Sequence, residues 1–218
     1  MKSSETMHQK AYWETNRTRR TPDHPVVRAF SFPKIKYVRE YIDIKTNTKI
    51  LDVGCGNGFF TYPFSSIADV IGVDISRRML HINPVDRLVQ GSARSLPFKD
   101  KSFEVVFCSN LLHHIDEPKC AVLEMSRVSR RYVVLSEPNR NNPLMALFSA
   151  KVPEERGALK FSIGYMCELV ESCGLAITGS CSMGAIVPNK TPERLLSIFQ
   201  IIDRKMPFAF YNILISQK

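Results

Sequence analysis

Two aspartates and three glycines carry the strongest chemical signal in the sequence. The stretch ILDVGCGNGFF places Gly54, Gly56 and Gly58 at every second position, directly after a run that is typical of a buried strand. Asp52 precedes these glycines, and Asp74 ends the next strand-like run, DVIGVD. Glycines at the carboxyl edge of a parallel sheet let the backbone approach a ligand closely. The pattern therefore predicts a ligand site where these two strands end.

The glycine spacing does not fit the common phosphate-binding motifs. A dinucleotide fingerprint needs a third glycine at the position of Phe59, and a phosphate loop needs a lysine after its glycines, which is absent here. Asp52 would repel a pyrophosphate but suits a ligand with a cationic amino group. Asp74 is placed to accept hydrogen bonds from two ribose hydroxyls. S-adenosylmethionine, a nucleoside that bears an amino acid, satisfies both constraints.

Four segments in order resemble motifs of the class I S-adenosylmethionine-dependent methyltransferases, closest to the branch that acts on small molecules such as quinones and lipids. They are ILDVGCGNG, VIGVDIS, GSARSLPFKDKSFEVVFCSNLLHHIDEP and YVVLSEPN, and together they cover about residues 48–140. The resemblance implies an α/β fold, a Rossmann-like three-layer sandwich. Its seven-stranded, mostly parallel sheet has the order 3-2-1-4-5-7-6, with strand 7 antiparallel. It also implies S-adenosylmethionine as the cofactor.

The resemblance assigns cofactor contacts to residues that follow successive strands. Asp52 would orient the amino group of the cofactor, and Asp74 would hold the ribose; the alternatives are a turn hydrogen bond for Asp52 and a helix N-cap for Asp74. Ser92 departs from the family, which usually has an aspartate there to bind adenine. The full predicted set is Asp52, Gly54, Cys55, Gly56, Gly58, Asp74, Ile75, Ser92, Ala93, Ser109 and Asn110.

Candidate catalytic residues follow the fourth and fifth strand-like runs. They are His113, His114 and Glu137. Methyl transfer is an in-line displacement, so alignment supplies much of the rate and a general base is optional. Adjacent histidines on one helical turn are expected to point differently, with one facing the site and the other packing. Glu137 is expected to line the acceptor pocket or to be a structural carboxylate.

Alternating strand-like and helical patterns position these residues. We expect a basic, helical N-terminal segment over residues 1–45 and a methyltransferase domain over 46–218, with an acceptor-side insertion at about 139–161. Ser162 and Gly174 punctuate a predicted helix, and Thr191 with Pro192 is predicted to open another. Strands are predicted at 48–55, 69–75, 87–92, 103–110, 130–139, 175–182 and 208–216, and early helices at 58–67, 76–82 and 117–127.

Composition limits the remaining function classes. The 218 residues carry a net charge of +9, and the excess lies toward both ends of the chain. The six cysteines form no CxxC pair and have no histidine at metal-site spacing, so no metal site is predicted. No apolar run approaches the ~20 residues of a membrane span, and a cytoplasmic protein is expected.

The acceptor is open at this level. A small-molecule or lipid-like acceptor is favoured because the motif of base amino-methyltransferases is absent after the fourth strand. An RNA methyltransferase that docks through the basic ends is one alternative, and a non-catalytic cofactor-binding module is another. The N-terminal segment is expected to close over the cofactor, with Tyr12, Trp13 and Arg17 as possible ligand contacts.

Overall fold

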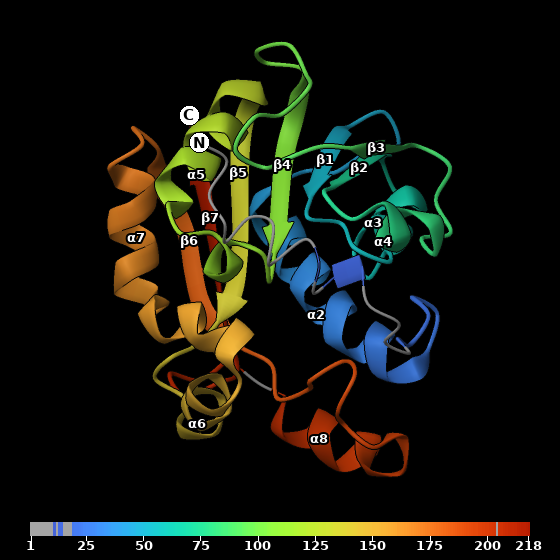
Figure 1. Ribbon diagram of the computed structural model, residues 1–218, viewed down its shortest axis with the longest axis vertical. Helices are drawn as coiled ribbons and strands as arrows, with labels where there is room; N and C mark the ends of the chain where they lie inside the picture. Colours follow the sequence, from blue (N-terminus) through green and yellow to red (C-terminus); the bar gives the residue numbers. More distant parts are fainter. Residues whose placement is uncertain (1–10, 12, 15–18, 204) are drawn as a thin grey trace.

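One mixed sheet forms the centre of the molecule. The computed structural model describes residues 11, 13–14, 19–203 and 205–218. Within them the strand order is β3-β2-β1-β4-β5-β7-β6, and β7 alone runs opposite to the other strands (Figure 1). The predicted topology is confirmed. The strands are β1 (Lys49–Val53), β2 (Asp69–Asp74), β3 (Leu88–Gln90), β4 (Phe103–Ser109), β5 (Ser129–Pro138), β6 (Ala176–Met183) and β7 (Tyr211–Gln217).

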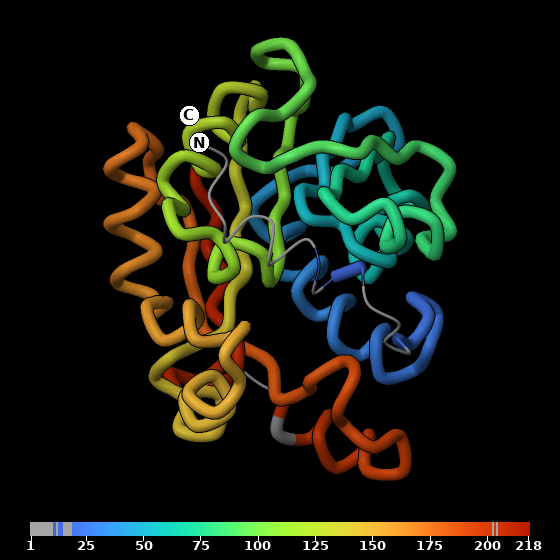
Figure 2. Tube along the Cα trace, in the orientation of Figure 1, coloured from blue at the N-terminus to red at the C-terminus, as the bar shows by residue number. Residues whose placement is uncertain are grey.

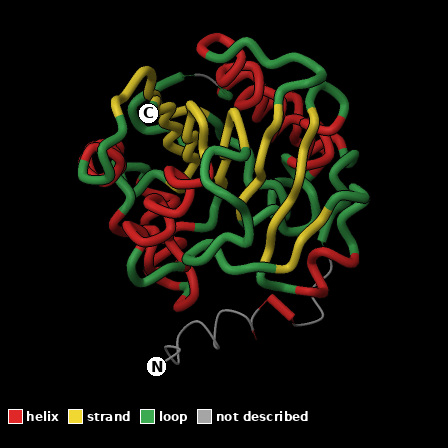
Figure 3. The backbone as a smooth tube through the Cα atoms, turned by 90° about the horizontal axis from the view of Figure 1, so that it is seen from above, coloured by secondary structure: helices red, strands yellow, loops and turns green. Residues whose placement is uncertain are grey.

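Helices cover both faces of this sheet, which gives three layers (Figure 3). α2 and α3 pack on one face, while α5 and α7 pack on the other. The helical elements are α2 (Pro25–Tyr41), α3 (Thr61–Ser65), α4 (Arg77–His81), η1 (Leu112–His114), α5 (Pro118–Val128), α6 (Pro143–Lys151), η2 (Pro153–Lys160), α7 (Ile163–Glu171), η3 (Glu193–Leu195) and α8 (Leu196–Ile202).

The central strands are apolar on both sides because both sides are covered. Ile50 of β1 belongs to the cluster under α2 and α3, whereas its neighbour Leu51 belongs to the cluster under α5 and α7. Both side chains are fully buried. Such continuous apolar runs are typical of parallel sheets that lie between helical layers.

Of the two predicted helix starts, the one at Ser162 is confirmed and the one at Thr191 is wrong. The Ser162 hydroxyl accepts a hydrogen bond from the Tyr165 amide and caps α7, and Gly174 follows the helix with φ of 76°. Thr191 does not open the next helix, because its hydroxyl accepts from the Val187 amide at 2.9 Å. Pro192 is extended, and a 3₁₀ turn precedes α8.

The carboxyl ends of the parallel strands carry most of the irregular structure. The stretch 139–161 contains α6 and η2, and it lies with α8 at the lower end of the molecule (Figure 2). Asn139 donates hydrogen bonds to the carbonyls of Pro207 and Ala209, and Asn142 donates to that of Phe208. These bonds tie the stretch to the chain that enters β7. None of the described helices combines the length and apolarity needed to cross a bilayer.

A lysine is buried between α2 and the sheet. Lys34 is 1% exposed, and its Nζ lies 3.6 Å from the ring centre of Phe30 and 4.3 Å from that of Tyr211. The same atom donates to the Phe30 carbonyl at 3.1 Å. Burial lowers the pKa of Lys34 to about 7, against the opposing effect of Asp203.

Replacing Lys34 with methionine should change how stability depends on pH. Between about pH 7 and 10.5 the unfolded chain holds this proton and the folded chain does not, so wild-type stability rises with pH across that window. In Lys34→Met the free energy of unfolding should rise less with pH. The gain over wild type should be largest below pH 7, with an upper bound of about 1.4 kcal/mol per unit by which the pKa is depressed. Denaturant melts from pH 6 to 10 measure it. Lys36→Met, exposed on the same helix, is the control. Equal slopes in wild type and Lys34→Met would contradict the assignment.

Candidate functional site

The glycine loop after β1 leaves open space at the carboxyl edge of the sheet. Gly54 and Gly56 have φ of 73° and 50°, a region that side chains other than glycine rarely adopt. The amide of Gly54 donates to the Val73 carbonyl at 2.8 Å, which fixes the loop against β2. A Cβ on Gly54 would collide with Leu111, whereas one on Gly56 would meet nothing within 4 Å. Gly56 therefore exposes bare backbone to a cavity.

Asp74 holds that loop from the next strand. Its Oδ2 accepts from the Gly56 amide and its Oδ1 from the Ser76 amide, both at 2.8 Å. The N-cap of α4 is Ser76, whose hydroxyl accepts from the Met79 amide, so the alternative that Asp74 caps this helix is wrong. Burial raises the pKa of Asp74, while the hydrogen bonds oppose the rise.

Asp52 is buried beneath the loop with a single side-chain partner. The Thr61 hydroxyl donates to its Oδ2 at 2.6 Å, and only 2% of the residue is exposed. Burial raises the pKa of Asp52 to about 7, although the hydrogen bond from Thr61 lowers it. This carboxyl therefore changes charge near neutral pH.

Three neighbouring cavities meet above the loop, and Trp13, Arg19 and Asn110 line all of them. The first cavity is lined by predicted cofactor residues of the first three strands, with Met79, Leu111, His114, Ile115 and Asp116 in addition. The second cavity lies at Asp52, Cys55 and Ser109. The third, of about 360 Å³, extends toward α6, Glu155 and Tyr211.

Ten of the eleven predicted cofactor residues line these cavities. The first cavity takes Gly54, Gly56, Asp74, Ile75, Ser92, Ala93 and Asn110, and the second adds Asp52, Cys55 and Ser109. Gly58 lines none of them. A Cβ there would lie 2.7 Å from the Asn83 side chain, and φ is 96°, so this glycine serves the turn itself.

The cavity walls contain buried polar atoms that have no partner among the described residues. They are the Ser109 hydroxyl and the Asn110 Oδ1. Asn110 also has φ of 52°, a strained conformation of the kind that clusters at functional sites. A ligand with an ammonium group would supply the missing donors. The residues present therefore fit the amino-acid end of S-adenosylmethionine.

A short N-terminal segment lies across the junction of the cavities. Arg20 donates through Nη1 to the carbonyls of Pro188 and Thr191, each at 2.8 Å. Asn57 of the glycine loop donates to the Arg20 carbonyl at 2.9 Å. The Arg19 guanidinium lies 4.6 Å above the ring of Trp13. Tyr12 and Arg17, the other predicted contacts, lie outside the described residues.

The three candidate catalytic residues form one buried cluster. Glu137 is fully buried and accepts from the amides of Leu111 and Leu112 at 3.0 and 2.8 Å. Its second oxygen is 2.5 Å from His113 Nδ1, and His113 Nε2 is 3.2 Å from Glu155 Oε2. Burial alone would lower the pKa of His113, but the two carboxylates raise it to about 9. His113 therefore donates to both.

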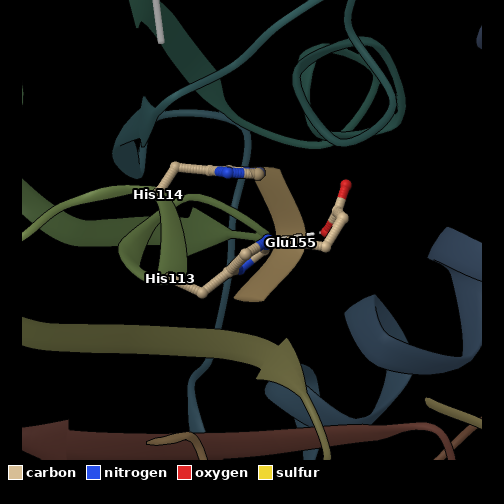
Figure 4. Close-up of side chains that lie close together, drawn as sticks. All are labelled: His113, His114 and Glu155. Carbon is tan, nitrogen blue, oxygen red and sulfur yellow. Dashed lines mark hydrogen bonds and ion pairs between the residues drawn. The ribbon is translucent and has the colours of Figure 1, made fainter. Parts of the chain in front are cut away.

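His114 has a different environment, although its ring centre is only 3.9 Å from that of His113. Its Nδ1 lies 3.0 Å from the Glu154 carbonyl. Because a carbonyl only accepts, the proton is on Nδ1 and the lone pair on Nε2. Burial and the neighbouring His113 lower the pKa of His114 to about 3. Figure 4 shows the two rings beside Glu155.

Both histidines face the site, contrary to expectation. His113 and His114 line the third cavity, and His114 also lines the first. Both histidines belong to the 3₁₀ turn η1, and their rings lie against each other at a tilt instead of pointing to opposite sides. Glu137 lines none of the three cavities. Sequence reasoning missed Glu155 and Arg19; Glu155 lies 42 positions after His113, and no local motif marks it.

The central part of the chain is similar to known methyltransferases. Residues 51–135 match a family model described as a methyltransferase domain. An uncharacterized methyltransferase of Bacillus subtilis is 29% identical over 49% of this chain and 47% of its own length. A demethylmenaquinone methyltransferase of Staphylococcus haemolyticus is 31% identical over 52% of each. The chain thus spans about half the length, or less, of the curated relatives it matches.

Solved structures match over most of the chain. A possible histamine N-methyltransferase from Thermotoga maritima has a TM-score of 0.69 at 20% identity, covering 88% of this chain and 92% of that one. An S-adenosylmethionine-dependent methyltransferase from Aquifex aeolicus covers 99% of both chains, with a TM-score of 0.63 at 15% identity. At these identities the likeness establishes the fold.

The affinity for S-adenosylhomocysteine should rise with pH in a way that depends on Asp52. As Asp52 ionises above about pH 7, it gains attraction for the ligand's ammonium group. Calorimetry should show affinity rising by up to about tenfold from pH 6 to 8, since proton loss and binding are linked. Asp52→Asn should bind more weakly with a flat profile, and exposed Asp86→Asn should match wild type. An unchanged slope in Asp52→Asn would refute the role.

Proposed function

We propose that the chain is a class I S-adenosylmethionine-dependent methyltransferase that transfers a methyl group to a small-molecule or lipid-like acceptor bound in the third cavity. One observation carries the proposal. Asn110 and His114 line both the first and the third cavity, so an acceptor in the third would lie next to a cofactor in the first. Its volume of about 360 Å³ is within the ordinary range of small-ligand sites.

The cofactor side would be held mainly by backbone and buried polar atoms. The cofactor supplies an electrophilic methyl group on a sulfonium. Gly54 and Gly56 leave room for it, and Asp52, Ser109 and Asn110 offer acceptors to its ammonium group. Ser92 and Ala93 line the first cavity where the resemblance expects adenine.

The acceptor side would be apolar with one polar wall. Met145 and Phe148 of α6 and Tyr211 of β7 supply the apolar surface, which suits a small organic molecule or the head of a lipid. His114 is the candidate to contact the acceptor, because it lines both cavities. Glu137 and His113 act as positioning residues that hold η1 by the bonds described above. Trp13 and Arg19 cover the junction and exclude water from it.

Alignment of the methyl donor with the acceptor would supply most of the acceleration of methyl transfer. Two reactants held in adjoining, preorganised cavities react as one molecule, which is worth roughly 7–11 kcal/mol in favourable cases. The distant demethylmenaquinone methyltransferases act on a quinone precursor by name, which agrees with an apolar acceptor.

Labelling should identify the acceptor class. When the protein is incubated with extract and a donor carrying a radioactive methyl group, label should enter the small-molecule or organic-solvent fraction. Asn110→Ala should reduce that labelling at least tenfold, because Asn110 lines all three cavities. Exposed Asn141→Ala is the matched control. Label in RNA would favour the RNA alternative, and no transfer at all would favour a non-catalytic module.

The single tryptophan should report cofactor binding directly. Trp13 is the only tryptophan in the sequence and lines all three cavities, so S-adenosylhomocysteine should change its fluorescence. Trp13→Ala should weaken binding about tenfold by calorimetry through lost contact, while Trp13→Phe should bind with less loss and no optical signal. Emission that is unchanged at saturating ligand would remove Trp13 from the binding site.

A further inference from the structure

The cluster around η1 offers three metal-ligating side chains at one point. One ligand atom each from His113, His114 and Glu155 lies within 4.8 Å of the other two. His113 Nε2 and Glu155 Oε2 are 3.2 Å apart, close to the separation of about 3.3 Å that metal bonds of about 2.0–2.1 Å give in a tetrahedral site. Figure 4 shows these side chains converging from η1 and η2.

The outer partners of both histidines are those of metal ligands. His113 donates its Nδ1 proton to the buried Glu137 carboxylate at 2.5 Å, and His114 donates its own to the Glu154 carbonyl at 3.0 Å. Metal-bound histidines almost always donate their second ring N–H to a carboxylate or a carbonyl, which fixes the tautomer and ring orientation. Both Nε2 atoms are thereby left as the ligand atoms.

We propose that His113 Nε2, His114 Nε2 and the Glu155 carboxylate bind one divalent transition-metal ion at the wall of the third cavity. Two imidazoles and one carboxylate form a set that leaves coordination positions open. These positions face the third cavity, which the three residues line together. Where the chain acts as proposed above, the ion binds an oxygen or nitrogen of the methyl acceptor and orients it toward the cofactor.

The charges around the site and the types of ligand atom together decide which ion it binds. Glu137 and Glu155 are the carboxylates in contact with His113, and Arg19 is the nearby guanidinium on the cavity wall. Binding replaces the proton between His113 Nε2 and Glu155, which leaves to solvent. Imidazole ligands suit Zn²⁺, Co²⁺ and Fe²⁺, whereas Mg²⁺ prefers oxygen ligands.

Equilibrium dialysis of the chelator-treated protein against Zn²⁺ tests the site, with bound metal measured by mass spectrometry. We expect one ion per chain that excess Mg²⁺ does not displace. His114→Phe and Glu155→Gln should each weaken Zn²⁺ binding more than 100-fold, and Glu137→Gln should weaken it about 10–100-fold through lost orientation. Glu171→Gln, an exposed substitution on α7, should bind as wild type does.

Two results would overturn the proposal: wild type binding less than one ion, or stoichiometric binding that survives both His114→Phe and Glu155→Gln. Co²⁺ in place of Zn²⁺ separates this site from a cysteine site, since thiolate ligands add an intense near-ultraviolet band. A thermal shift with S-adenosylhomocysteine confirms that each variant folds. Failure of that shift in wild type would overturn the proposed function and leave the metal result standing.

Discussion

A buried carboxylate organises the turn after β4, beside the third cavity. Glu137 has no exposed surface, and burying a charge is costly unless it is paired and hydrogen-bonded. Its partners are two backbone amides of the turn after β4 and the ring of His113. Because β5 carries Glu137 and β4 leads into that turn, the carboxylate joins adjacent strands at their carboxyl ends. The positions of both histidines depend on this contact.

A second constraint, left-handed backbone, shapes the cofactor side. Gly54, Gly56 and Asn110 all have positive φ, and they follow the neighbouring strands β1 and β4. The strain at Asn110 is compensated in part by its amide, which donates to the Ser136 carbonyl at 2.8 Å. Leu111, in the turn after β4, fills the space over Gly54. Residues of both turns line the first and second cavities.

The fold, and most residues that line the first and second cavities, were predictable because they follow from local patterns. Strand-like runs buried on both faces, separated by helices, specify a parallel sheet, and residues such as Asp74 and Ser109 sit at strand ends whose place that sheet dictates. Glu155 was not predictable, because its meeting with His113 depends on how α6 and η2 fold back over η1. The helix start predicted at Thr191 was wrong for a different, local reason. The Thr191 hydroxyl accepts from the Val187 amide four residues earlier and closes a turn there instead of capping the helix.

The two halves of the site differ in how tightly the sheet holds them. The residues around the glycine loop sit on or beside strands, whereas the wall of the third cavity combines Trp13 and Arg19 with residues of α6, η2 and 187–190. These segments are attached by a few backbone-directed bonds, such as those of Asn139, Asn142 and Arg20. Their side chains therefore change without disturbing the glycine loop or the packing of β1 and β2. An acceptor wall attached in this way can vary in specificity over a constant cofactor site, so the sequence motifs identify the donor and leave the acceptor to be read from the structure.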